Sequence, residues 1–347
     1  MRKKAIYIFF SVFAFAVTLL VISIASDNAA FYISDTVCIA VRNSLAFLTS
    51  PFRFSVFELL VFLSPILLFF ALRYLLRGKG ASLERFLLLV SLLSFVFSLY
   101  VFTLGIPQFV QFEVSPSEDV PTEAELIGAA EYLIDDISKI TAEHPSPSDP
   151  RELYRELSNS YSELGGSMNF SFSALPIPKP LKTSRLASCL GVLALYSFPT
   201  GEINLNLDIP DYMLPFTLSH EYAHFIGAAN EGVANYIAFL ACVGAKNPYV
   251  RYSGELSALE YILSDVSKID SDSYNLLYGK IPQMAVRDMS EYREYCRRYS
   301  KSFFYKLSDR LNSAHLNLWD SSGKTSYSCV SKYVTHYLNS TYNDTTV

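Results

Sequence analysis

Cysteine is scarce in this sequence and widely scattered. The 347 residues include five cysteines, and no two of them form a C-x-x-C pair. Disulfide-stapled secreted domains and cysteine-ligated zinc sites both need closer and more regular spacing. We therefore expect free buried thiols, and neither a disulfide framework nor a metal bound through cysteine.

Charge is also in short supply. Only 18% of the residues are charged, against 51% that are hydrophobic and 15% that are aromatic, and the net charge is −5. No basic stripe with interleaved aromatic residues occurs, so nucleic-acid binding is not expected. The hydrophobic excess is larger than one ordinary soluble domain requires, which indicates membrane segments.

Three long apolar runs account for this excess. They cover residues 5–26, 55–76 and 86–109, and each is long enough to cross a hydrocarbon core of about 30 Å as a helix. The first run exceeds the usual apolar region of a cleaved signal peptide, and further runs follow it, so we expect a retained anchor. The sequence thus predicts a membrane domain, residues 1–112, with three transmembrane helices in the lipid bilayer.

Basic residues set the expected orientation. They precede the first run and fill the short connection between the second and third runs, whereas residues 27–54, expected to be a loop, contain only Arg42 and Arg53. By the positive-inside rule, the N-terminus is then cytoplasmic. Three crossings predict a multi-pass protein of the cell membrane whose C-terminal domain, residues 113–347, is extracytoplasmic.

The composition becomes polar and richer in charge from Glu113 onward, which marks the domain boundary. Helical patterns cover residues 121–141, 150–164, 253–266, 270–279, 287–313 and 326–340. The pattern of residues 185–208 predicts strand and turn, and we expect an edge strand there that could hold an extended substrate. The predicted fold class is membrane-anchored α+β, in which a mostly helical domain with a small sheet follows the transmembrane helices.

The clearest chemical signal is H-E-x-x-H at residues 220–224. In an α-helix, His220 and His224 lie one above the other, so both imidazoles can reach one metal ion. Glu221, about 100° round the helix, can face a metal-bound water. This combination is typical of zinc hydrolases.

A third protein ligand is required, and Glu231 is the predicted one. On an unbroken helix it would lie about 10 Å beyond His224, so the chain must turn between them. Gly227 can end the first helix in a left-handed conformation, and Asn230 is a suitable N-cap for a second helix. Asn235, one turn after Glu231, could hydrogen-bond a ligand histidine and orient it.

These residues also carry a family resemblance. The pattern H-E-x-A-H-x-x-G-x-x-x-E-x-x-A-N over residues 220–235, with Y-V-R-Y-S-G at 249–254, resembles bacterial membrane-anchored zincin-like proteins classed as a domain of unknown function. The likeness covers most of the chain, and its central motif is similar to that of gluzincin metallopeptidases. Val233 stands where the family pattern has a second acidic residue, which leaves Glu231 as the carboxylate available there. The resemblance implies peptidase chemistry without naming a substrate.

We therefore hypothesise a membrane-anchored zinc metallopeptidase acting on a peptide or protein substrate. His220, His224 and Glu231 would hold Zn²⁺, and Glu221 would accept a proton from the zinc-bound water as it attacks a peptide bond. Candidate donors to the oxyanion, by residue type alone, are Tyr249, Arg251, Tyr252 and His336.

Two alternatives remain open at this point. One is a non-proteolytic, membrane-tethered binding or scaffolding module with the same fold, and the other is a different zinc hydrolase such as an amidase. An intramembrane protease is not expected, because the motif does not lie within a long apolar run.

Overall fold

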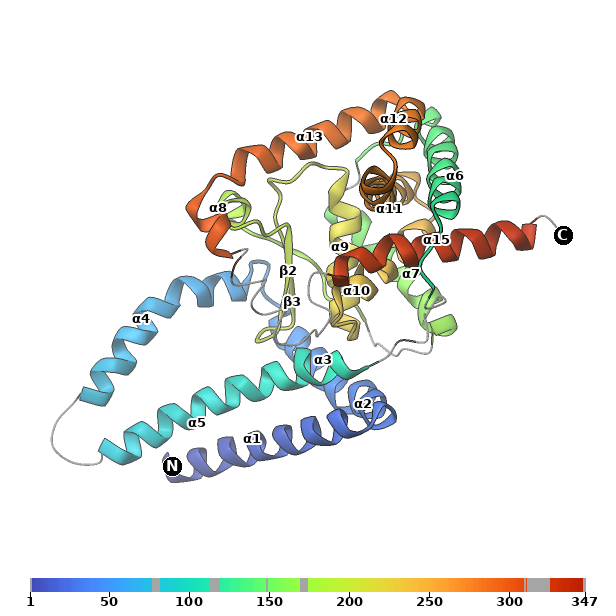
Figure 1. Ribbon diagram of the computed structural model, residues 1–347. Helices are drawn as coiled ribbons and strands as arrows, with labels where there is room; N and C mark the ends of the chain where they lie inside the picture. The colour runs from blue at the N-terminus through green and yellow to red at the C-terminus, as the bar shows by residue number, and fades with distance from the viewer. Residues whose placement is uncertain are drawn as a thin grey trace.

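The computed structural model describes residues 2–76, 82–110, 112, 119–147, 149–168, 174–308, 310 and 325–345. This part of the chain is mostly helical and has one three-stranded sheet, as predicted (Figure 1). Apolar helices form the N-terminal third, and the helices and sheet that carry the H-E-x-x-H motif pack beside them.

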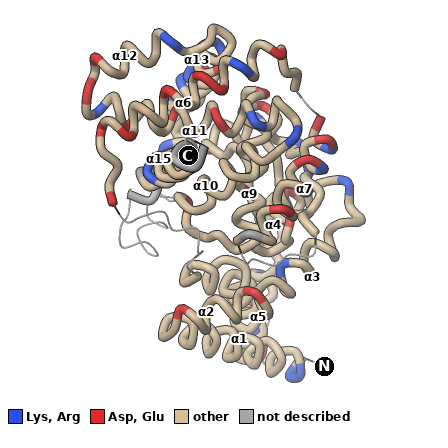
Figure 2. The backbone as a smooth tube through the Cα atoms, turned by 90° about the vertical axis from the view of Figure 1, so that its right-hand side faces the viewer, with Lys and Arg blue, Asp and Glu red and all other residues tan. Residues whose placement is uncertain are grey.

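Three of the N-terminal helices match the predicted apolar runs. They are α1 (Arg2–Ala25), α4 (Val56–Leu76) and α5 (Ser82–Tyr100). The last of them continues through a π-helical turn, Val101–Gly105, and a 3-10 turn, Ile106–Phe109. Charged residues are sparse along α1 and gather on the helices at the far end of the molecule (Figure 2). Apolar helices of this length suggest membrane anchoring.

The segment expected to be a loop, residues 27–54, is helical instead. It forms α2 (Asp27–Ile33), a π-helical turn (Ser34–Cys38) and α3 (Ile39–Thr49). Among the described residues, four helical stretches are therefore long and apolar enough to cross a membrane, and Asp27–Thr49 is the additional one. Arg42, which lies in this segment, is buried and donates a hydrogen bond to the main-chain oxygen of Ile226 in the second half of the chain.

The relative directions of the apolar helices follow from their ring contacts. Phe9 of α1 lies 5.1 Å from Phe95 of α5, and Phe15 lies 6.2 Å from Phe102, so α1 and α5 run in the same direction. The connection from α4 to α5 is only five residues long, which places the end of α4 near the start of α5. The C-terminal ends of α1 and α5 and the start of α4 thus share one end of the bundle.

The second half of the chain is an assembly of helices around a small sheet. Its helices are α6 (Glu123–Ala142), α7 (Pro150–Met168), α8 (Ser184–Cys189), α9 (Met213–Ile226), α10 (Glu231–Val243), α11 (Pro248–Ile269), α12 (Ser271–Lys280), α13 (Gln283–Tyr299) and α15 (Thr325–Thr345). Thr122 and Glu125 form a capping box at the start of α6. Buried apolar side chains of α6, α7, α9, α10, α11 and α15 form the main core.

The sheet contains β1 (Lys179–Pro180), β2 (Ala194–Ser197) and β3 (Glu202–Leu205) in the order β1-β3-β2. β3 pairs parallel with β1 and antiparallel with β2. The strand directly before α9 is therefore central, and the expectation of an edge strand there is wrong. The two edge strands are β1 and β2, and β2 also lies within residues 185–208.

Two further expectations need correction. The first residues of the stretch 185–208, which was expected to be strand and turn, belong instead to α8. The helix expected over residues 287–313 ends at Tyr299, and the chain turns before it becomes helical again at 303–308. Ser302 accounts for the new start, because its hydroxyl accepts a hydrogen bond from the Tyr305 amide.

A buried polar network crosses the predicted domain boundary. The Lys179 ammonium lies 2.5 Å from the Glu202 carboxylate and donates to the main-chain oxygen of Thr49 at the end of α3. The same carboxylate accepts hydrogen bonds from the amides of Val56 and Phe57 at the start of α4. α3 and the start of α4 are thus built into the structure of the second half.

Candidate metal centre

A helix–turn–helix arrangement carries the motif, as the sequence predicts. α9 ends at Gly227, whose φ of 114° lies in the left-handed region. The side chain of Asn230 caps α10 by accepting a hydrogen bond from the Val233 amide. The two helices meet at 120°, so Glu231, the first residue of α10, returns to the histidine face of α9.

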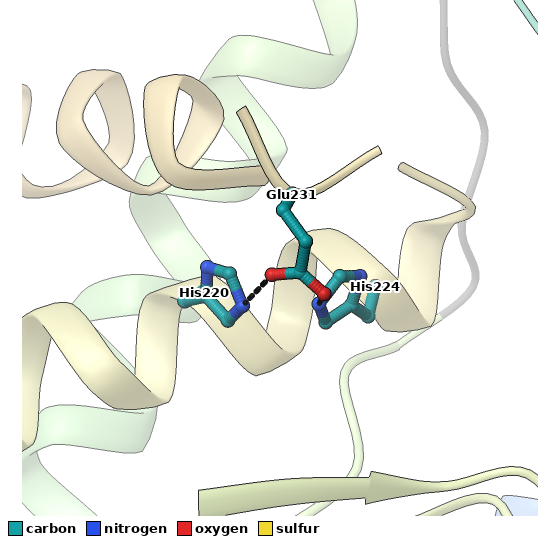
Figure 3. A group of neighbouring side chains, drawn as sticks. All are labelled: His220, His224 and Glu231. Atoms are coloured by element: carbon teal, nitrogen blue, oxygen red, sulfur yellow. Dashed lines mark ion pairs between the residues drawn. The ribbon is translucent and has the colours of Figure 1, made fainter. Parts of the chain in front are cut away.

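The turn brings three potential ligands together. The Glu231 carboxylate lies 3.3 Å from Nε2 of His220 and 3.6 Å from Nε2 of His224 (Figure 3). One ligand atom from each residue lies within 4.8 Å of the other two, and this is the one such group of three found among the described residues. The side chains are 13–22% exposed, so the group is shielded but open to solvent.

This donor set fits a zinc ion. A tetrahedral ion about 2.1 Å from each ligand atom places neighbouring ligand atoms about 3.4 Å apart. Oε2 of Glu231 lies at about this distance from Nε2 of His220, and Oε1 of Glu231 lies at about this distance from Nε2 of His224, so each contact involves a different carboxylate oxygen. Two imidazoles and one carboxylate leave a fourth position for water or substrate, which is the pattern of catalytic rather than structural zinc sites.

One histidine is held in an orientation suited to metal binding. Nδ1 of His224 lies 2.8 Å from the main-chain oxygen of Ala228, just beyond the end of α9. If Nδ1 carries the proton, Nε2 has a free lone pair that faces Glu231. Nδ1 of His220 is buried without a hydrogen-bond partner in the described structure.

The charges of the three residues are strongly coupled. Burial acts to lower the pKa of His224, but the Glu231 carboxylate outweighs it and raises that pKa to about 9. Burial acts to raise the pKa of Glu231, and His224 and His220 instead hold it well below its ordinary value. The carboxylate is thus ionised and attracts positive charge, which either protons on the imidazoles or a metal cation can provide.

Glu221 lies beside this group, on the inner side of α9. It is 7% exposed, and its carboxylate accepts a hydrogen bond from the main-chain amide of Tyr196 on β2. Burial raises the pKa of Glu221 above its ordinary value, while His220 and His224 oppose that shift. A carboxyl group whose pKa is raised and whose orientation is set suits proton transfer.

The other predicted residues are placed differently. Asn235 is buried, but its side chain hydrogen-bonds to neither histidine, and its amide nitrogen has no partner in the described part of the chain. The group that orients His224 is instead the Ala228 carbonyl, which residue types alone do not reveal.

The suggested oxyanion donors are engaged elsewhere. Arg251 pairs with Asp136, the Tyr252 hydroxyl donates to Asp288, and Nε2 of His336 lies 2.9 Å from the main-chain oxygen of Asp119. Tyr249 lines a separate pocket at the N-terminal end of α9.

Tyr261 of α11 was not singled out by the sequence, and it interacts electrostatically with Glu231. Burial, and then the charge of Glu231, raise its pKa to about 12. A neutral phenol close to Glu231 can donate a hydrogen bond to developing negative charge. Tyr261 lies thirty residues after Glu231 and on a different helix, α11, so no local pattern in the sequence connects it with the motif.

The fold and the site together define a mostly helical protein with N-terminal apolar helices and a His-His-Glu group that could hold a metal ion. The chain belongs to the DUF3810 family, described as a protein of unknown function, whose family model matches residues 32–335. That match begins inside α2 and covers α3, α4, α5 and the candidate site. No curated protein and no solved structure matches the chain.

Proposed function

We propose that this protein is a membrane-anchored, zinc-dependent metallopeptidase that hydrolyses peptide bonds on the extracytoplasmic face of the cell membrane. The observation that carries the proposal is the convergence of His220, His224 and Glu231 at distances suited to a tetrahedral ion, with Glu221 beside them. A zinc ion held there would supply Lewis acidity that polarises a carbonyl and acidifies water.

The residues of the chain have separate roles in this proposal. His220 and His224 bind through Nε2, and Glu231 binds through its carboxylate. Glu221 accepts the proton of the attacking water and passes it to the departing amine. The Tyr196 amide holds the Glu221 carboxylate in place during both transfers.

The sheet supports a peptide as the substrate class. β2 is at the edge of the sheet, and its Tyr196 amide points away from β3 toward Glu221. An extended peptide that adds to this edge would pass directly by the catalytic carboxylate. Such pairing would bind the substrate through main-chain hydrogen bonds, and the main chain contains the bond that a peptidase cleaves.

The helix directions support the proposed topology. α1 and α5 run parallel and α4 runs in the opposite direction, so the N-terminus and the α4–α5 connection share one end of the bundle (Figure 1). Asp27–Thr49 joins two helix ends at the opposite end and packs against the site-bearing half, so it lies on that side without crossing. Basic residues gather at the end that holds the N-terminus and the α4–α5 connection, so the positive-inside rule assigns that end to the cytoplasm.

Metal content of the full-length protein tests the proposal. The full chain is required because α3 and α4 are hydrogen-bonded into the second half. We expect about one zinc per chain by elemental analysis, lost in His220→Ala and Glu231→Gln and kept in Glu221→Gln. His336→Ala is the matched control, because His336 lies on α15 and contacts the main-chain oxygen of Asp119. This substitution should leave the zinc content unchanged.

Absence of metal in folded wild-type protein supplied with zinc would overturn the proposal and favour a non-proteolytic module. Bound zinc without peptide cleavage, but with cleavage of other amide substrates, would favour an amidase.

A further inference from the structure

A mixed apolar and basic surface lies on α8 and on the helical segment 303–308. Its apolar members protrude strongly: Phe303 is 73% exposed, Phe304 54%, Leu186 46% and Leu307 44%. Its basic members are all exposed: they are Lys182, Arg185, Lys301 and Lys306. We call these eight residues the α8 face.

Specific contacts hold the two parts of this face together. The Ser302 hydroxyl donates to the main-chain oxygen of Cys189 at the end of α8. The ring of Tyr305 packs so tightly on Gly191 that a β-carbon there would approach within 2.8 Å of it. Segment 303–308 is therefore a defined part of the surface beside α8.

The α8 face lies next to the start of α4. The Glu58 carboxylate of α4 accepts hydrogen bonds from the Thr183 amide and hydroxyl and from the Lys182 amide, directly before α8. In Figure 1 the segment after α13 turns past α8 toward the start of α4. From Leu59 onward α4 exposes apolar side chains almost continuously, so the α8 face is continuous with the surface proposed to enter the bilayer.

The composition of the face matches the headgroup region of a membrane. Exposed Phe and Leu side chains beside Lys and Arg are typical of surfaces that lie in the lipid interface. Arg185 lies 3.9 Å from Asp208, and the charge of Lys182 interacts with Glu58. Lys301 and Lys306 form no ion pair among the described residues, which leaves their charges available to lipid phosphates. The nearby α3–α4 turn has the same character, with Phe52, Arg53 and Phe54 exposed.

We propose that the α8 face binds the surface of the bilayer that holds α4, inserting Phe303, Phe304 and Leu307 among the lipids and pairing its basic residues with anionic phospholipid headgroups. The inference rests on the proposed membrane insertion of α4 and is independent of zinc and of peptidase activity. The lipid contact would add to the hydrogen bonds that already join the second half to α3 and α4, and it would help to fix the height of that half above the membrane.

Depth-dependent fluorescence quenching tests this directly. Trp319 is the single tryptophan of the chain, so Trp319→Phe provides a silent background. In full-length protein reconstituted into phosphatidylcholine vesicles, with or without phosphatidylglycerol, a tryptophan is introduced by Phe304→Trp, Leu68→Trp or Leu276→Trp. Leu68 is exposed on α4, and Leu276 is exposed on α12, at the far end of the molecule (Figure 1).

We expect lipids brominated near the headgroup to quench Phe304→Trp at least twofold more than Leu276→Trp, and deeply brominated lipids to quench Leu68→Trp. If Leu68→Trp is quenched but Phe304→Trp is quenched no more than Leu276→Trp, the proposed lipid contact of the α8 face is overturned, whereas the membrane insertion of α4 stands. Failure to quench Leu68→Trp would overturn the membrane insertion of α4 and the inference with it.

The charge preference has its own test. The double substitution Lys301→Glu and Lys306→Glu should reduce quenching of Phe304→Trp in vesicles that contain phosphatidylglycerol. Without this double substitution, added salt should also reduce the quenching of Phe304→Trp in the same vesicles. The same double substitution at exposed Arg297 and Arg298 on α13 is the matched control. Quenching that is equal with and without phosphatidylglycerol would overturn the anionic preference.

Discussion

The guanidinium of Arg42 donates a hydrogen bond to the main-chain oxygen of Ile226, 184 residues later in the chain, at 3.2 Å. Ile226 is the last residue of α9, two positions after His224. Arg42 is only 1% exposed, and its Nε and Nη1 have no hydrogen-bond partner in the described structure. A helix of the N-terminal third thus supports the end of the helix that carries both histidines.

Replacing this support should weaken the metal site more than the fold. In Arg42→Met the Ile226 carbonyl loses its partner, but the cost of burying a guanidinium disappears too, so we expect a change in unfolding free energy within about 1 kcal/mol. Zinc affinity should fall on the order of tenfold, as for other groups that support ligands. Competition with a zinc chelator measures this, and Arg53→Met at an exposed position is the control. Unchanged affinity would show that Arg42 does not position the site.

Gly227 should not tolerate a side chain. Its φ of 114° strains any other residue, and a β-carbon there would approach within 3.1 Å of Nη1 of Arg42. We expect Gly227→Ala to lower the unfolding free energy by about 1–2 kcal/mol and to reduce zinc affinity, because the turn sets the return of Glu231. Gly279→Ala on α12, where a β-carbon meets no neighbouring atom, should be neutral or stabilising. Thermal unfolding of both variants in detergent would show the contrast, and equal melting temperatures would contradict it.

Glu221→Gln should separate catalysis from metal binding. The amide keeps the size of the side chain but cannot accept a proton, so we expect peptide cleavage to fall by at least about a hundredfold with zinc content unchanged. The readout is kcat on a peptide substrate beside elemental analysis of the same sample. Retained cleavage would assign proton transfer to another group.

Tyr261→Phe tests whether the phenol near Glu231 acts on the reaction. Removing one donor to an oxyanion lowers kcat on the order of a hundredfold in other hydrolases, and we expect a loss of that order with zinc affinity and KM little changed. Tyr292→Phe on α13 is a control for loss of a buried hydroxyl. A rise in KM alone would point to substrate binding instead.

Glu255 of α11 should make stability depend on pH. Burial, and then the neighbouring Asp136, raise its pKa to about 9, against the opposing charge of Arg251. The folded state therefore holds a proton that the unfolded state releases near pH 4.5, so this contribution is complete below that pH and is lost as pH rises toward 9.

Glu255→Gln removes this titration. Its melting temperature should fall less between pH 6 and pH 9 than that of the wild type, with a difference in unfolding free energy on the order of a few kcal/mol. Glu294→Gln, at an exposed position on α13, should follow the wild-type profile. Parallel profiles for Glu255→Gln and wild type would show that Glu255 is ionised in the folded protein.

The correct predictions from the sequence share a physical basis. The spacing of His220 and His224, the break at Gly227 and the cap at Asn230 each depend on residues within about one helical turn. The three apolar runs and the helical share of the chain likewise depend on local composition. The sequence also determined which residues gather around Glu231, because the turn between the two helices is only four residues long.

Tertiary structure decided what distant segments do to one another. Residues 27–54 were expected to be a loop, yet they are helical and bury Arg42, whose guanidinium donates to the main-chain oxygen of Ile226. β3 is a central strand because β1 pairs with the side that β2 leaves free. β2 is an edge strand, and its Tyr196 amide donates to the Glu221 carboxylate. Such contacts join residues tens to hundreds of positions apart, and no local periodicity, cap or turn residue records them. The sequence by itself therefore determined the three candidate ligands and the apolar helices, whereas only the fold decided which groups hold and orient them.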